Sequence, residues 1–193
     1  MRYLKQAILA FCVLAILCGL MYPLFITGLS QFLFPQKANG RIITLGNKAV
    51  GSGLIGQQFN SPKYFHGRPS ATDPAYNANG SAASNFGPTN AHFLDEVRRR
   101  VVEIRNKNGL PANTPIPADL VLASASGLDP HISVASAMLQ IRRIAKERGV
   151  PESEVEEMAR RHIEYPLLGI WGEPRVNVLK LNLALDSQER MRR

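Results

Sequence analysis

The sequence predicts an α+β protein in which a single N-terminal transmembrane helix is followed by one compact extracytoplasmic α+β domain. Residues 7–34 contain no charged side chain, which predicts the helix. Helical periods bounded by glycine and proline follow, with short β-branched runs between them, and this mixture predicts the domain. The chain has 193 residues, so about one domain remains beyond the helix.

The apolar run from residue 7 to residue 34 is long enough to cross a bilayer, since a spanning helix needs roughly 20 apolar residues. A signal peptide has a shorter apolar core of roughly 7–15 residues and a small-residue cleavage site, which this run does not show. We expect residues 1–6 to form a short cytoplasmic tail, residues 7–34 the helix and its exit, and residues 35–193 the extracytoplasmic domain. Basic residues on both sides of the run leave the orientation undecided by charge, and the short N-terminal tail favours an N-terminus in the cytoplasm.

Two features inside the run predict local structure. Pro23 removes a helix hydrogen bond, so we expect a kink or a change of helix geometry there. Ala15 and Gly19 form a small-xxx-small pair, which lets another transmembrane helix pack closely. Both cysteines, Cys12 and Cys18, lie in the run, so the domain contains neither a disulfide framework nor a thiol nucleophile.

The formal net charge of +8 raises the question of a nucleic-acid partner. Arg98, Arg99 and Arg100 are consecutive, so on a helix they fan around more than half of its circumference and form no single docking face. No aromatic residues alternate with them for stacking on bases. We expect a solvated helix face and no nucleic-acid binding.

Motifs for catalysis and metal binding are absent from the sequence. The four histidines are scattered without a second ligand at metal spacing, and no phosphate loop or nucleophile motif is present. Residues 51–56 spell GSGLIG, but the continuation QQFNSP does not open a helix, so a dinucleotide site is rejected. We expect no catalytic residues, no metal site and no intrinsically bound cofactor.

The elements of the domain follow from periodicity and turn signals. Residues 41–50 predict one or two short strands, and residues 62–90 predict a long irregular loop whose aromatic residues pack against this domain or a partner. Residues 120–125 predict a short strand or a helical turn. Helices are expected from a Thr89 or Asn90 cap to Asn108, from Asp129-Pro130 to Arg148 and from Pro151 to Ile163. Residues from Val176 to Leu185 fit either a strand or a helix, with the helix favoured, and a frayed tail is expected after them.

Several dense segments are more informative than any of these patterns. They are YFHGRPSA at residues 64–71, SNFGP at 84–88, SGLDPHIS at 126–133, and GEPRVNVL continuing to LNLALD at 172–186. In these segments, and over essentially its whole length, the chain resembles the C subunit of the Kdp potassium-transporting ATPase, the KdpC family.

The resemblance implies an accessory, non-catalytic subunit of an ATP-driven high-affinity potassium uptake complex. Its partners would be a channel-like A subunit that selects potassium, a P-type ATPase B subunit and a small F subunit. The chain would lie in the bacterial inner membrane as a single-pass protein, with its N-terminus cytoplasmic and its domain periplasmic. The family is described as a catalytic chaperone that raises the nucleotide affinity of the pump, with ATP bound in a ternary complex.

Candidate residues follow from the same segments. A surface that docks on the A subunit would include Tyr64, Phe65, Arg68, Pro69, Arg175 and Asn177. A weaker hypothesis places nucleotide at the hydroxyls and helix start of the SASGLDPHIS segment, on Ser124, Ser126, Gly127 and His131. The alternative is a stand-alone membrane-anchored periplasmic ligand-binding or sensor domain, which a small-molecule pocket holding a histidine and a carboxylate would favour.

Overall fold

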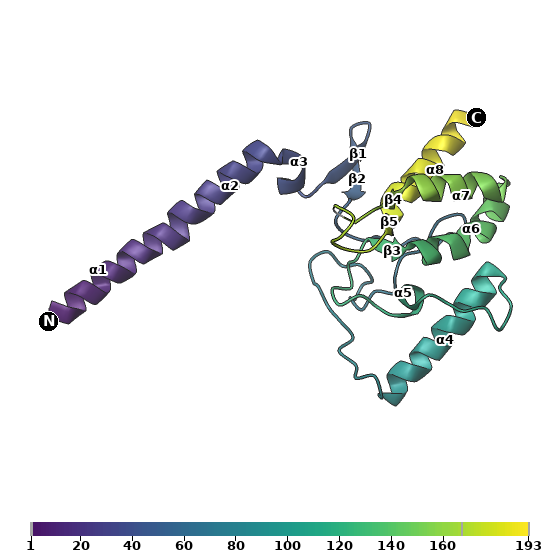
Figure 1. Cartoon of the computed structure of the whole chain (residues 1–193), viewed down its shortest axis with the longest axis horizontal. Coiled ribbons are helices and arrows are strands. Elements are labelled where there is room, and N and C mark those ends of the chain that lie inside the picture. The colour runs from purple at the N-terminus through teal and green to yellow at the C-terminus, as the bar shows by residue number, and fades with distance from the viewer. Residues whose placement is uncertain (1, 167, 193) are drawn as a thin grey trace. The chain divides into compact units, whose positions relative to one another are not determined.

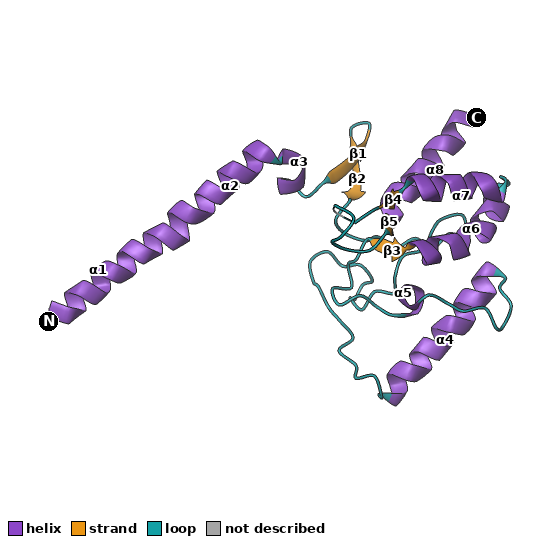
Figure 2. Cartoon of the chain, in the orientation of Figure 1, coloured by secondary structure: helices purple, strands orange, loops and turns teal. Residues whose placement is uncertain are grey.

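The computed structural model describes residues 2–166 and 168–192. The chain divides into two compact units, Met1–Ala49 and Val50–Arg193. The first contains the apolar helix and the second contains the α+β domain (Figures 1 and 2).

The apolar helix is built from α1 (Arg2–Ile16), the π-helical segment η1 (Leu17–Met21) and α2 (Tyr22–Leu33). Figure 1 shows the three as one continuous rod. Over Arg2–Leu33 it is 32 residues long with a mean hydropathy of 2.5, and it is the one helix among the described residues that is long and apolar enough to cross a membrane. The predicted apolar helix is confirmed, and it already includes residues 2–6 of the predicted tail.

The change of geometry expected at Pro23 is also confirmed, and it lies in the turn before the proline. The backbone N–H of Tyr22 donates to the carbonyl of Leu17, which is an i to i−5 bond rather than the usual i to i−4 bond. Because proline has no N–H to donate, a widened turn just ahead of it relieves the crowding that a regular helix would meet.

A short connection follows the rod. It consists of α3 (Pro35–Ala38) and then β1 (Ile42–Leu45) and β2 (Lys48–Ser52), which pair as a two-stranded sheet. Gly46 lies between the strands with a φ of +61°, a left-handed conformation that glycine adopts at little cost. The strands predicted for residues 41–50 are confirmed.

The second unit combines five helices and a small antiparallel sheet among its described residues. The sheet has the order β3-β5-β4, with Ile132 and Ile163 both opposite Val176 of the central strand. The elements in chain order are α4 (Ala91–Asn108), α5 (Ala118–Val121), β3 (His131–Ser133), α6 (Val134–Arg148), α7 (Glu152–Arg161), β4 (Ile163–Glu164), β5 (Arg175–Asn177) and α8 (Val178–Arg192).

Two strands of this sheet continue directly into helices, and each ends in a capping residue. Ser133 Oγ accepts from the N–H of Ser136 at the start of α6, and Asn177 Oδ1 accepts from the N–H of Lys180 at the start of α8, both at 3.1 Å. Such caps satisfy amides that the helix itself leaves unpaired. Because β3 and β5 are antiparallel, the sheet fixes the N-terminal ends of α6 and α8 at opposite ends of the paired strands.

The hydrophobic core lies between α6, α7, α8 and the sheet. It also includes Phe65 from the long loop, whose side chain is completely buried. The other buried members of the cluster are Ile132, Ala137, Ile141, Ile144, Ala145, Val155, Ala159, Val176, Val178, Leu181 and Leu185.

The helix predicted from an Asn90 cap to Asn108 is confirmed. Asn90 accepts from the N–H of Phe93 at 3.0 Å, and Gly109 ends the helix with a φ of +61°. Of the two alternatives for residues 120–125, the helical turn is found, slightly earlier in the chain as α5.

Three predicted boundaries are wrong, each because a strand takes residues assigned to a helix. The helix expected from Asp129 begins at Val134, after β3. The helix expected to reach Ile163 ends at Arg161, and Ile163 pairs in the sheet. The helix expected from Val176 begins at Val178 because β5 precedes it.

The frayed C-terminal tail is the fourth correction, since α8 continues to Arg192. Ion pairs hold this end of the helix. Arg148 contacts Asp186 and Glu189, each at 2.9 Å, and Arg192 contacts Glu154.

Candidate functional site

The long loop after β2 is held in place by buried amide side chains. Asn182 accepts from the backbone N–H of Phe65 at 2.8 Å and donates to its carbonyl at 2.9 Å. Gln140 does the same for His66, at 2.8 and 3.1 Å. Each amide side chain thus replaces the partner strand that this stretch of backbone lacks, which is how buried peptide groups avoid being left unpaired.

Arg143 fastens the same loop from α6. Its guanidinium, which is almost fully buried, donates to the carbonyls of Pro62 and Tyr64, to Asn108 Oδ1 at 2.9 Å and to Gln140 Oε1 at 2.8 Å. Burial lowers the pKa of Arg143 to about 10, and the charge of Glu147 opposes this shift. The hydrogen bonds from Asn182, Gln140 and Arg143 therefore form a clamp that holds residues 64–66 against α6 and α8.

Tyr64 lies at the outer edge of this clamp. Its hydroxyl donates to Asp186 at 3.0 Å, and the Arg148 guanidinium lies 5.1 Å from the centre of its ring. Burial and the carboxylate of Asp186 raise the pKa of Tyr64. The contacts made by Tyr64 join the loop to α6 and α8.

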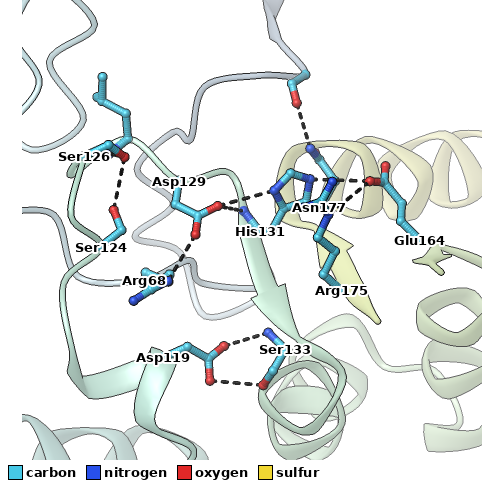
Figure 3. Close-up of polar contacts among 12 residues, drawn as sticks. Arg68, Asp119, Ser124, Ser126, Asp129, His131, Ser133, Glu164, Arg175 and Asn177 are labelled. Carbon is cyan, nitrogen blue, oxygen red and sulfur yellow. Dashed lines mark hydrogen bonds and ion pairs between the residues drawn. The ribbon is translucent and has the colours of Figure 1, made fainter. Parts of the chain in front are cut away.

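A chain of charged side chains crosses the edge of the three-stranded sheet (Figure 3). Arg68 contacts Asp129 at 3.1 Å, and the other oxygen of Asp129 lies 3.3 Å from His131 Nδ1. On its far side His131 Nε2 lies 3.5 Å from Glu164, which also contacts Arg175 at 3.8 Å. These side-chain contacts connect the loop, β3, β4 and β5.

Both carboxylates in this chain are held in the ionised form. Burial raises the pKa of Asp129, but hydrogen bonds from His131 and the charge of Arg68 outweigh it and leave the pKa below its usual value. Burial likewise raises the pKa of Glu164, and Lys180, at 2.6 Å, and His131 reverse the shift. Each acid therefore remains charged and paired, which is not the state of a general acid at neutral pH.

Asp119 occupies the start of α6. Its carboxylate accepts from the N–H of Ser133 at 2.7 Å and from Ser133 Oγ at 3.0 Å (Figure 3). It also accepts from Ser136 Oγ at 2.6 Å. An anion at a helix N-terminus is stabilised by nearby hydrogen-bond donors and by the helix dipole. In this domain the position is filled by the protein's own carboxylate.

The hypothetical nucleotide residues make contacts within the domain. Ser124 and Ser126 hydroxyls lie 3.4 Å apart, and Ser126 Oγ also accepts from the N–H of Leu128 at 3.1 Å. Gly127 has a φ of +67° and its carbonyl accepts from Ser70 Oγ at 2.7 Å. Because α6 starts at Val134, the helix start expected at this segment is absent from it, and His131 lies on β3 instead.

Two open grooves flank the charged chain. One of about 410 Å³ is lined by Arg68, Asp119, Asp129, His131 and Arg175, among others. The second, of about 370 Å³, lies between α4 and the long loop. Among the described residues, no group of three or more histidine, cysteine, aspartate or glutamate side chains is placed to hold a metal ion.

The predicted interface residues divide into two groups. Phe65 and Asn177 are buried to 0% and 1% exposure, so their side chains stabilise the domain and have no surface to offer a partner. Tyr64, Arg68 and Pro69 are partly exposed and Arg175 is exposed, so a docking role for these four stays a prediction.

Ala15 and Gly19 lie on α1 and η1, and a Cβ placed on Gly19 would meet no atom within 4 Å, so a helix-packing role also stays a prediction. Sequence reasoning missed Glu164, which joins His131 to Arg175 in the charged chain, and Asp119, which accepts hydrogen bonds at the start of α6. Their partners are distant in sequence or lie on strands too short to detect.

Comparison with known proteins adds what the geometry alone does not give. A family model described as "KdpC: K+-transporting ATPase, c chain" matches residues 4–187. The chain belongs to the KdpC family. The resemblance carried by the four dense segments is therefore confirmed.

Curated relatives of this KdpC-family chain match it almost end to end, and each is named "Potassium-transporting ATPase KdpC subunit". The protein from Methylococcus capsulatus is 50% identical over 188 residues, covering 96% of this chain and 98% of the relative. Those from Koribacter versatilis and Rhodopseudomonas palustris are 47% and 46% identical, covering 98% and 97% of this chain and 97% and 98% of the relatives.

Proposed function

We propose that this chain is an accessory, non-catalytic subunit of an ATP-driven high-affinity potassium uptake complex. The observation that carries the proposal is the match to the KdpC family over residues 4–187, in a chain that covers nearly all of its named relatives. The apolar rod Arg2–Leu33 would hold the subunit in the bacterial inner membrane, with the N-terminus in the cytoplasm and the domain in the periplasm.

The contacts within the domain favour a subunit that binds other proteins over one that catalyses a reaction. Asp119, Asp129 and Glu164 each accept hydrogen bonds or ion pairs from neighbouring side chains. Breaking such pairs to free a catalytic group would leave charges unpaired, which is costly in a partly buried setting. The partners would be a channel-like A subunit, a P-type ATPase B subunit and a small F subunit.

Co-purification tests this assembly. The tagged full-length chain, extracted with its membrane in mild detergent, is expected to bring down the A and B subunits. Arg175→Ala should reduce the captured amount, because Arg175 is exposed and lies at the start of β5, at one end of the charged chain. Arg160→Ala is the matched control, since Arg160 is similarly exposed on α7 and pairs only within its own helix. Equal capture by both variants would remove Arg175 from the interface, and no capture by the unmodified chain would refute the assembly.

We also propose that the subunit raises the ATP affinity of the B subunit, acting as a catalytic chaperone, with ATP bound only in a ternary complex. The hydroxyls of Ser124 and Ser126 are engaged inside the domain, which favours a shared site over a site on this chain alone. The apparent KM for ATP should rise when the chain is omitted from the reconstituted complex. An unchanged KM would refute the chaperone role, and an intact complex with Ser126→Ala tests whether that hydroxyl takes part.

A second candidate function is favoured by the groove of about 410 Å³, which contains His131 and the carboxylate of Asp129. This combination is expected of a stand-alone membrane-anchored ligand-binding or sensor domain. Calorimetric titration of the full chain with small charged solutes distinguishes the two. Tight binding by the chain free of other subunits would favour the second function.

A further inference from the structure

The loop between β4 and β5 carries a concentration of exposed apolar side chains. Tyr165, Leu168, Ile170 and Trp171 are 74%, 77%, 75% and 66% exposed. No charged residue lies between Glu164 and Glu173, so the apolar stretch is uninterrupted in sequence. Isolated exposed hydrophobic residues are common on soluble proteins, whereas several gathered on one short segment mark an interaction site.

The backbone of this loop is set by local turns and by both of its ends. The N–H of Gly169 donates to the carbonyl of Pro166 at 3.1 Å. Leu168, Gly169 and Gly172 have φ values of +54°, +73° and +106°, a region that a leucine rarely adopts. At the base, β4 and β5 pair through Ile163 and Val176, and Val176 is fully buried. The apolar side chains are therefore presented from a fixed base.

While these side chains are exposed, the protein does not gain the favourable free energy of burying their apolar surface. Burial of apolar surface is favourable in proportion to the area removed from water, so large side chains such as these contribute most. Tryptophan and tyrosine are also the residues that most often dominate the affinity of protein interfaces. A loop with both, next to two aliphatic side chains, has the composition of an interface centre.

The charges around the loop distinguish between a lipid and a protein partner. Binding to anionic lipid is strengthened by about 1 kcal/mol for each nearby lysine or arginine. Here the charged residues beside the loop are Glu164, Glu173, Arg175 and Lys180, with two acids and two bases, and Arg175 and Lys180 already contact Glu164 at 3.8 and 2.6 Å. Without a basic excess, the loop is better suited to an apolar protein surface than to an anionic bilayer.

We propose that the described residues of this loop, 165, 166 and 168–172, form a docking loop that inserts Trp171 and its apolar neighbours into an apolar pocket on another protein subunit of the ATPase complex. The pocket would carry a basic group at its rim to pair with the exposed Glu173. This inference rests on the proposed function and adds to it the surface that makes the contact.

The single tryptophan of the chain makes the loop directly observable. Because Trp171 is the only tryptophan among 193 residues, its emission reports on this loop and nothing else in the chain. The full chain, labelled with 5-hydroxytryptophan so that it is distinguished from tryptophans of the other subunits, is measured alone in nanodiscs and within the assembled complex. The nanodiscs contain phosphatidylethanolamine and phosphatidylglycerol.

The expected result is a blue shift and reduced acrylamide quenching of the label in the complex, with solvent-exposed emission in the nanodiscs. Solvent-exposed emission in the complex would overturn the proposal. A blue shift in the nanodiscs alone, with quenching by brominated lipid, would show that the loop binds the membrane and would overturn it as well.

Co-purification provides the second measurement. Ile170→Ser combined with Trp171→Ser is expected to lower capture of the other subunits by at least about thirtyfold, because loss of an interface centre costs 2 kcal/mol or more. Val102→Ser on α4, where Val102 is 55% exposed, is the matched control and should capture normally. Undiminished capture by the loop variant refutes only the docking loop. Failure of the unmodified chain to capture any subunit refutes the proposed function and the loop together.

Discussion

The clamp between Asn182 and the loop residue Phe65 gives the sharpest test of how this domain is held together. In Asn182→Ala, the N–H and carbonyl of Phe65 lose partners at 2.8 and 2.9 Å. Phe65 and Asn182 are 0% and 1% exposed, so water cannot replace those partners without opening the loop. Each buried group left unpaired costs about 1–3 kcal/mol.

The net effect follows from two opposing contributions. Two unpaired groups cost about 2–6 kcal/mol. Alanine is the better helix former on α8 by at most about 0.7 kcal/mol, which offsets little of this cost. We therefore expect a loss of about 1–5 kcal/mol from a domain stability that is typically about 5–15 kcal/mol.

Urea unfolding of the full chain in detergent, followed by far-ultraviolet circular dichroism, measures this loss. Hydrogen exchange locates it, because the amides of Phe65 and His66 should exchange faster in the variant. Asn106→Ala is the control, since Asn106 is an exposed asparagine on α4. A change below about 0.5 kcal/mol, within the range of ordinary surface substitutions, together with unchanged exchange at Phe65, would refute the clamp.

Two further predictions concern the same domain. Gly127→Ala should lower the free energy of unfolding by about 1–3 kcal/mol, because φ is +67° and the new Cβ would lie 2.8 Å from the carbonyl oxygen of Ala82. Gly80→Ala is the control and should lower it much less, because there is open space around Gly80. Equal urea midpoints for the two variants would contradict this prediction. Burial and the charge of Arg143 lower the pKa of His66 from 6.5, so the unfolded chain binds its proton first. Stability should therefore fall as the pH drops below about 6.5 towards the lowered pKa, and His66→Gln should show a smaller loss across that range.

Local signals in the sequence were sufficient for the elements that depend on them. Asn90 and Gly109 bound α4 as expected, and Gly149 ends α6 with a φ of +66°. Pro23 correctly predicted the irregular turn in the apolar rod. In each case the physical cause is a cap, a left-handed glycine or a missing N–H within a few residues of the effect.

The small sheet could not be predicted in the same way. Its strands are two or three residues long, so no alternation is visible, and they exist because Ile132 and Ile163 both pair with Val176. Asp129-Pro130 has the composition of a helix start, but Asp129 instead accepts from the N–H of His131 at 3.0 Å and pairs with Arg68. The long-range contact with Arg68 therefore determines the conformation at Asp129, and the local helix-start pattern does not.

The candidate site shows the same limit. The aromatic residues of the YFHGRPSA segment were correctly expected to pack, but Phe65 packs in the domain's own core. The most exposed apolar loop, around Trp171, was missed because a short apolar run has the same composition whether it is buried or exposed.

The Asn182–Phe65 clamp has a consequence for how the protein is made. It joins residues 117 positions apart, and the Tyr64–Asp186 contact joins residues 122 apart. During synthesis, the loop at residues 64–65 cannot form these hydrogen bonds until α8, which carries Asn182 and Asp186, has been made. The domain can therefore close only after residues 182–186 have been made, and a premature stop before residue 182 would leave the N–H and carbonyl of Phe65 without these hydrogen-bond partners.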